Sequence, residues 1–115
     1  MARIGIFNGK DMKVAITSSG NTAAASLDQR FGRCAYFAIY DTDTQELAFV
    51  ENSAKNADSG AGPAAVAIVA AQGVQKIVSG EFGFKIKGML DDLNIQMVMV
   101  KDDKTVEEII ALLAQ

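Results

Sequence analysis

Apolar and polar residues alternate in short runs through the first half of the chain, a pattern typical of β-strands. It predicts strands at residues 12–17, 36–40 and 47–50. The polar residues 41–45 separate the last two runs, so these two strands should form a hairpin. Residues 18–26 are small and polar, which predicts a loop before the second strand.

The second half alternates helix-like and strand-like segments. Pro63 suits the first turn of a helix over residues 63–72, and Gly73 is placed to end it. This helix is apolar on nearly every side and is expected to be buried. Further apolar periodicity predicts a strand at 76–79, a helix from Phe82 to Leu93, a strand at 95–100 and a helix after the capping box at 105–108.

The order of these elements is β-β-β-α-β-α-β-α. A hairpin followed by βα units predicts one α/β domain, in which a mixed sheet is covered by helices. Residues 1–11 are harder to assign, because Arg3 to Phe7 is strand-like and Asn8-Gly9 suits a turn, yet Met12-Lys13-Val14 looks like a natural start. We treat residues 1–11 as a leader, either an added tag or an extra strand, and residues 12–115 as the domain.

Composition narrows the class of ligand. The chain has 115 residues, a net charge of −3 and no basic run, so binding to nucleic acid is not expected. The longest apolar stretch, residues 64–71, is too short to span a membrane, and no secretory signal is recognisable. We therefore expect a cytoplasmic protein without membrane attachment.

The chain contains one cysteine, Cys34, and no histidine. An intramolecular disulfide and any histidine-based catalytic dyad or triad are therefore excluded. A closed structural zinc site, which needs about four cysteine or histidine ligands, is not expected either. Metal chemistry would have to use Cys34, carboxylates, backbone groups or ligands from a second chain.

The densest candidate site is the segment from Leu27 to Phe37. Arg30 and Arg33 flank Cys34, and nearby cations favour a thiolate, which is the soft ligand that iron–sulfur centres and copper(I) prefer. Arginine forks also suit an anionic ligand. In the competing interpretation, Cys34 is a small buried apolar residue and the two arginines are solvated.

Two glycine-containing loops precede predicted helices. Gly60 and Gly62 lie before the first helix, and Gly80 and Gly83 lie before the second. Helix N-termini with exposed backbone N–H groups bind anions, although the same glycines can simply serve tight turns. Neither loop matches a dinucleotide fingerprint or a P-loop.

Scattered carboxylates raise the alternative of a two-metal nuclease, which requires several acids to converge. The first strand carries no carboxylate, so this alternative is disfavoured.

Taken together, these motifs resemble the dinitrogenase iron–molybdenum cofactor biosynthesis family. The resemblance covers residues 12–115 and is most specific at Arg30-Phe31-Gly32-Arg33-Cys34-Ala35-Tyr36-Phe37. It implies a ribonuclease-H-like, mixed five-stranded sheet with the first strand central and three helices around it. Many members carry histidine where this chain has Arg30, so one plausible cluster ligand is missing.

The resemblance implies a non-catalytic carrier. It would hold a metal–sulfur cluster, containing Fe–S or molybdenum, while the cluster moves between cluster-assembly and cluster-accepting proteins. We expect Cys34 to be the metal ligand and the protein to be a monomer or weak homodimer. The alternative is a metal-free regulatory domain that binds a small anion or a partner protein. The residues expected to contact the cluster are Arg30, Phe31, Gly32, Arg33, Gly60, Gly62, Gly80 and Gly83.

Overall fold

A five-stranded mixed sheet runs through the centre of the computed structural model, which describes residues 12–113. The strands lie in the order β3-β2-β1-β4-β5. The elements along the chain are β1 (Lys13–Ser18), the 3₁₀ helix η1 (Phe31–Arg33), β2 (Tyr36–Asp41), β3 (Leu47–Glu51), α1 (Ala61–Ala71), β4 (Lys76–Ser79), α2 (Phe84–Asp92), β5 (Gln96–Met99) and α3 (Val106–Leu113).

The first strand is central, as the family resemblance implied. β1 pairs antiparallel with β2 and parallel with β4, while β2 and β3 form the expected antiparallel hairpin. Residues 14–18 are all buried because helices or loops cover both faces of the sheet. The leader, residues 1–11, lies outside the described residues.

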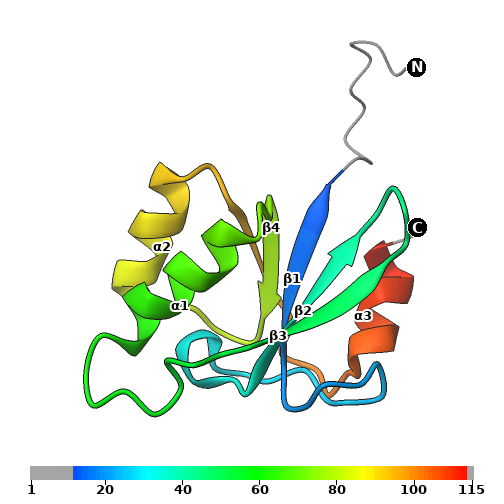
Figure 1. The fold of residues 1–115 in the computed structure, drawn as a ribbon, viewed down its shortest axis with the longest axis horizontal. Helices are drawn as coiled ribbons and strands as arrows, with labels where there is room; N and C mark the ends of the chain where they lie inside the picture. Colours follow the sequence, from blue (N-terminus) through cyan, green and yellow to red (C-terminus); the bar gives the residue numbers. More distant parts are fainter. Residues whose placement is uncertain (1–11, 114–115) are drawn as a thin grey trace, which may run out of the picture.

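Helices cover the two faces unequally. Figure 1 shows α1 and α2 side by side on one face of the sheet and α3 alone on the other. The core accordingly has two parts: one around Phe37 and Ile77 beneath α1 and α2, and a smaller one around Ile16 and Ile109 beneath α3. None of the helices described is both long and apolar enough to cross a bilayer.

The capping box at the start of α3 is confirmed. The Thr105 amide donates to Glu108 Oε1 at 2.8 Å, and the Glu108 amide donates to Thr105 Oγ1 at 3.2 Å. The expected burial of α1 is only half right. Its outer side, with Ala64, Ala67 and Ala70, is exposed, because alanine is apolar enough to blur the helical pattern yet small enough to face water at little cost.

Candidate functional site

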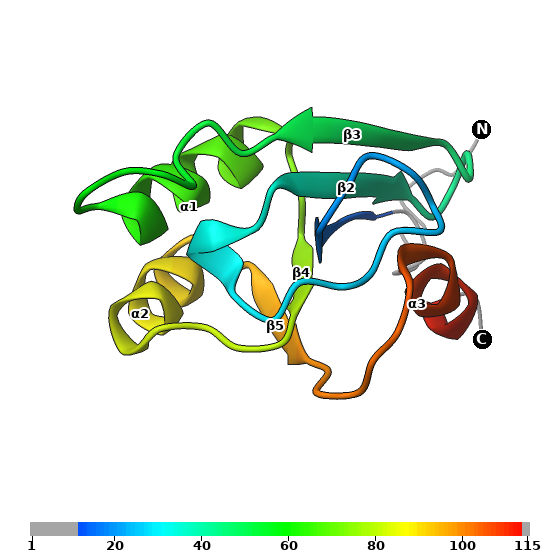
Figure 2. The same cartoon turned by 90° about the horizontal axis from the view of Figure 1, so that it is seen from below.

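The link between β1 and β2 contains η1, an element that no pattern in the sequence predicted. Figure 2 shows this turn beside the N-terminal ends of α1 and α2. An isolated parallel bridge joins Arg30 to Glu81, so the segment before η1 lies against the loop that follows β4. Phe31 then turns inward, with its ring 5.7 Å from the rings of both Phe37 and Phe82.

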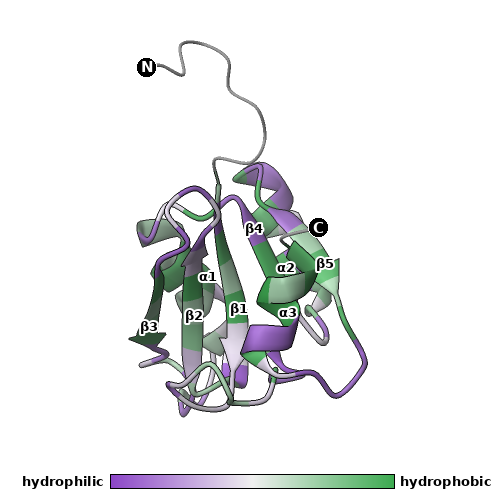
Figure 3. Ribbon diagram, turned by 90° about the vertical axis from the view of Figure 1, so that its right-hand side faces the viewer, coloured by the Kyte–Doolittle hydropathy of each residue, from purple (hydrophilic) through white to green (hydrophobic). Residues whose placement is uncertain are grey.

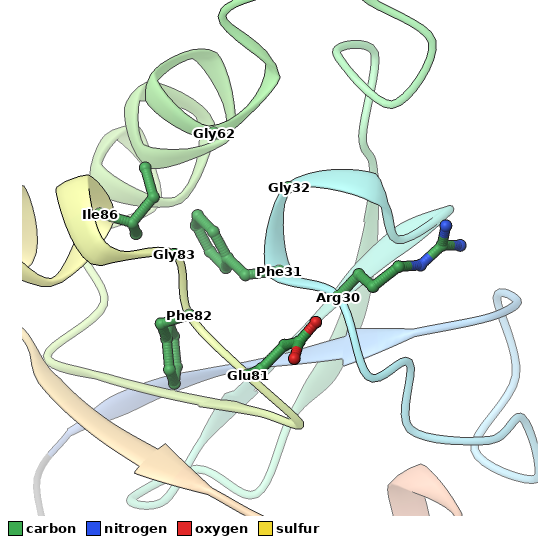
Figure 4. A pocket seen from close by; sticks show the side chains of 8 residues that line it. All are labelled: Arg30, Phe31, Gly32, Gly62, Glu81, Phe82, Gly83 and Ile86. Carbon is green, nitrogen blue, oxygen red and sulfur yellow. The ribbon is translucent and has the colours of Figure 1, made fainter.

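These contacts enclose a pocket of about 370 Å³. Its volume lies in the range of small-molecule sites. It opens at the end of the sheet where β4 stops, which is where ligands commonly bind in open α/β folds. As Figure 4 shows, the residues that line it are Arg30, Phe31, Gly32, Gly62, Glu81, Phe82, Gly83 and Ile86.

Two helix N-termini contribute to this pocket, through Gly62 in the first turn of α1 and through Gly83 immediately before α2. No side chain caps either helix. The first amides of a helix have no intrahelical acceptor and carry partial positive charge, so both ends favour an anion. The pocket therefore combines an apolar floor with backbone groups suited to negative charge.

Glycine at position 62 allows the close approach that forms the pocket wall. A Cβ atom there would lie 2.7 Å from Ile86 Cδ1, and a Cβ at Gly32 would lie 3.2 Å from the Cα of Gly62. Side chains at either position would push η1, α1 and α2 apart. These two glycines thus serve packing and leave backbone exposed to the pocket.

Five of the eight residues expected to contact a cluster line the same pocket, although they come from three separate parts of the chain: Arg30, Phe31, Gly32, Gly62 and Gly83. Arg33, Gly60 and Gly80 are not among the lining residues. Gly60 caps α1 with φ +74°, a left-handed conformation that explains the glycine. Gly80 lies against Gln29, where a Cβ would be 2.5 Å from the Gln29 Cα atom.

Arg33 has a structural contact of its own. Its guanidinium donates to the carbonyl oxygens of Lys55 at 2.9 Å and Ala57 at 2.7 Å. It thereby fastens the loop between β3 and α1 to η1. Asn52, in the same loop, also fastens it to η1, because its fully buried amide donates to the carbonyls of Gly32 at 3.2 Å and Cys34 at 2.9 Å.

Charge around the pocket is mixed. The Arg30 side chain extends away from the apolar floor (Figure 4), and its Nε lies 3.7 Å from Asp28 Oδ1. Glu81 is the one carboxylate among the lining residues, and its Oε1 lies 3.9 Å from the Lys101 ammonium. The Lys101–Glu81 pair is solvent-exposed on both sides and contributes little to stability, while in the other pair Arg30 is exposed and Asp28 is mostly covered. Arg30, which is 62% exposed, is free of tight packing and can reorient toward a bound anion.

The expectation that flanking arginines favour a Cys34 thiolate is wrong. The side chain is fully buried, and burial together with the charge of Asp28 raises the thiol pKa to about 12. The Cys34 Sγ lies 3.4 Å from the Phe31 carbonyl oxygen, to which the thiol donates. Arg30 and Arg33, although close in sequence, form their contacts with Asp28 and with the β3–α1 loop instead. The competing interpretation, a buried apolar cysteine, describes these surroundings better.

This burial predicts a pH dependence of stability. The pKa of Cys34 is raised from 9.0 to about 12 in the folded state, so above pH 9 the unfolded chain loses a proton that the folded chain keeps. The contribution of the protonated Cys34 thiol to the free energy of unfolding is fully present below pH 9 and disappears as the pH rises towards 12. Relative to Cys34→Ala, the wild type should lose about 1.4 kcal/mol of unfolding free energy by pH 10.

Urea titrations of both proteins at pH 7, 9 and 10 measure this difference. The alanine variant is the control, since it differs from the wild type only in lacking the thiol. Parallel pH profiles for the two proteins would contradict the buried-thiol description.

Three lining residues were not named as site residues in the sequence analysis: Glu81, Phe82 and Ile86. The sequence did contain a signal for them. Glu81 and Phe82 follow the Ser79-Gly80 turn in the loop before α2, and Ile86 lies in the first turn of that helix. Asn52 gave no signal, because a polar residue in a polar loop reveals nothing about burial. Among the described residues, no three cysteine, aspartate or glutamate side chains converge in a way that could hold a metal ion.

Comparison with known proteins assigns this chain to a family. Residues 12–115 match the family model described as dinitrogenase iron-molybdenum cofactor. The chain belongs to this family. This chain is also similar to an uncharacterized protein of Methanocaldococcus jannaschii, with 30% identity over 95 residues, which cover 80% of this chain and 77% of that protein.

Two solved structures share the fold of this family member. The apo form of the orange protein from Desulfovibrio gigas has a TM-score of 0.83 and 26% identity, over 88% of this chain and 85% of that one. A NifB-like protein from Thermotoga has a TM-score of 0.76 and 29% identity, over 87% and 84%. The family and the five-stranded α/β architecture implied by the resemblance are thus confirmed. The family name associates the fold with an iron–molybdenum cofactor, and a cofactor-related binding or carrier role follows from it.

Proposed function

We propose that this protein is a non-catalytic carrier whose cargo, an anionic metal–sulfur cluster or its precursor, binds in the pocket between η1, α1 and α2. The observation that carries the proposal is the convergence of Arg30, Gly32, Gly62 and Gly83 on one small pocket. Family membership supplies the class of cargo, and the pocket supplies a place whose chemistry suits it. Cluster-assembly and cluster-accepting proteins would be its partners.

The donor set of the pocket indicates how such a cargo would be held. No thiol lines it, the chain has no histidine, and Glu81 is its one carboxylate. Attraction would therefore come from the two helix N-termini and from Arg30, once its guanidinium turns toward the mouth. Phe31, Phe82 and Ile86 would exclude water from the inner side and so strengthen these interactions.

A ligand role for Cys34 stays a prediction. The thiol is fully buried, and deprotonating it would cost about 4 kcal/mol more than deprotonating an exposed thiol, given a thiol pKa of about 12 rather than 9.0. Metal binding can offset such a cost, but the side chain would also have to leave its contact with the Phe31 carbonyl.

Anaerobic reconstitution with iron, sulfide and molybdate, followed by desalting and metal analysis, tests the carrier function. Gly83→Leu should reduce retained metal at least about tenfold, because a Cβ at Gly83 meets only Ile86, at 3.8 Å, and a longer side chain would fill the pocket without a backbone clash. Gly88→Leu is the matched control on the same helix, where a Cβ meets nothing within 4 Å.

Each outcome is informative. If the wild type retains no metal, or if both leucine variants retain as much as the wild type, the pocket is not the cargo site. Cys34→Ala, run in parallel, isolates the predicted ligand: loss of metal in this variant, with its fold intact by circular dichroism, would support coordination by the thiolate.

The alternative function, a metal-free domain that binds a small anion, is favoured by one observation. The pocket offers backbone donors and an arginine but lacks a set of metal-ligating side chains. Thermal-shift measurements with phosphate, sulfate and molybdate would separate the two functions. Stabilisation by a metal-free anion, abolished by Gly83→Leu, would support this alternative.

A further inference from the structure

β5 forms one edge of the sheet. Within residues 12–113 it pairs only with β4, and Figure 3 shows it at the border of the sheet, mostly hydrophobic, with α2 and α3 on either side of the sheet plane. Its four residues are Gln96, Met97, Val98 and Met99.

The hydrogen bonds to β4 determine which backbone groups face outward. The amides of Gln96 and Val100 donate to the carbonyls of Gln75 and Ser79, both at 3.0 Å. In a parallel pair, alternate residues of a strand bond to the same neighbour, so residues 96, 98 and 100 face β4. Met97 and Met99 therefore direct both their N–H and C=O groups away from the sheet.

This edge lacks the features that usually prevent pairing. Natural edge strands carry lysine, proline or a bulge, or are covered by other segments. The strand Gln96–Met99 contains no charged residue and no proline, and Met99, a large apolar side chain, is 55% exposed. The one protective feature is its shortness, which limits the strength of any pairing.

We propose that β5 pairs antiparallel with β5 of a second copy of this chain, about a two-fold axis at Val98. Met97 of one copy then lies opposite Met99 of the other, and each of the two such pairs exchanges two backbone hydrogen bonds. Met99 packs beside Met97 of the second copy on the face of the sheet that α1 and α2 cover. An isologous contact of this kind closes on itself and yields a dimer with one ten-stranded sheet.

Charge favours β5 over β3, the opposite edge. Glu46 precedes β3 and Glu51 is its last residue, so pairing of two β3 strands would gather four carboxylates along a short contact. Pairing through β5 places Lys101 of one copy opposite Ile95 of the other, and no like charges meet along the paired residues. The self-complementary edge is therefore β5.

The dimer would keep the two pockets separate. Both pockets lie near the end at which β4 stops, and antiparallel pairing sends these ends in opposite directions. Each copy would thus bind its own ligand, and the proposal stands whether or not the pocket carries a cluster.

Sedimentation equilibrium from about 10 µM to 1 mM tests the pairing, since a short interface should associate in this range. The average mass should rise from 12.2 kDa towards twice that value for the wild type. Met99→Lys should hold it at the monomer mass by placing a charge in the pairing edge. Leu112→Lys, the control, alters an exposed residue of α3 in the same way and should dimerise like the wild type.

Amide hydrogen exchange locates the contact. The amides of Met97 and Met99 should gain at least about fivefold protection between the lowest and highest concentrations, because only in the dimer do they have acceptors. A constant monomer mass up to 1 mM, equal dimerisation of both lysine variants, or concentration-dependent protection at Leu47 and Phe49 instead would each overturn the proposal.

Discussion

Asn52→Ala is expected to lower the free energy of unfolding by about 4 kcal/mol. The Asn52 side chain is fully buried, donates to the carbonyls of Gly32 and Cys34, and accepts the Ala54 amide at 3.1 Å. Alanine would leave these three backbone groups without partners in a region that water does not reach, and each unsatisfied group costs about 1–3 kcal/mol. Urea denaturation followed by circular dichroism measures the loss.

Asn56→Ala provides the matched control in the same loop. Asn56 is exposed, so its replacement should change stability by less than about 0.5 kcal/mol. A comparable loss in both variants, or a loss below about 1 kcal/mol for Asn52→Ala, would show that the amide does not hold η1 in place.

Gly80→Ala should cost about 3 kcal/mol, the second largest expected effect. The new Cβ would lie 2.5 Å from the Cα of Gln29, and this obstacle is backbone rather than a flexible side-chain end. To relieve it, the loop after β4 must move away from the segment before η1, which would break the bridge between Arg30 and Glu81. Thermal and urea unfolding of the variant would report the destabilisation.

Gly88→Ala is the control for this glycine. A Cβ at position 88 meets nothing within 4 Å and lies inside α2, so alanine should stabilise the helix by about 0.5–1 kcal/mol. If Gly80→Ala unfolds at the same urea concentration as the wild type, the close approach of Gln29 is not a constraint on this fold.

The sequence predicts the fold well because its signals are local. The polar residues 41–45 mark the hairpin, and Thr105 and Glu108 mark the start of α3 through a reciprocal hydrogen bond. Boundaries shifted by only one or two residues at most elements. The helix η1 escaped detection because three residues provide no periodicity, and what holds it is its hydrogen bonding to the distant β3–α1 loop through Arg33 and Asn52.

The candidate site was predictable in part for the same reason. Glycines before helices indicate backbone exposure, and of the four glycines expected from this signal Gly62 and Gly83 line the pocket. Closeness in the sequence gave the wrong expectation for the contacts between the two arginines and the Cys34 thiol. Arg30 and Arg33 lie within four residues of Cys34, yet the chain turns through η1 in this segment, and both guanidinium groups contact other partners.

The walls of the pocket come from residues 30–32, 62, 81–83 and 86, which meet only when the sheet and both of its neighbouring helices are assembled. An unfolded chain therefore has no comparable binding site, and any occupant binds the native state alone. Occupancy then adds to stability by mass action, by about 2.7 kcal/mol at a free concentration one hundred times the dissociation constant. A molecule with an occupied pocket should resist proteolysis longer than an empty one, so that degradation in the cell would remove preferentially the copies whose pocket is empty.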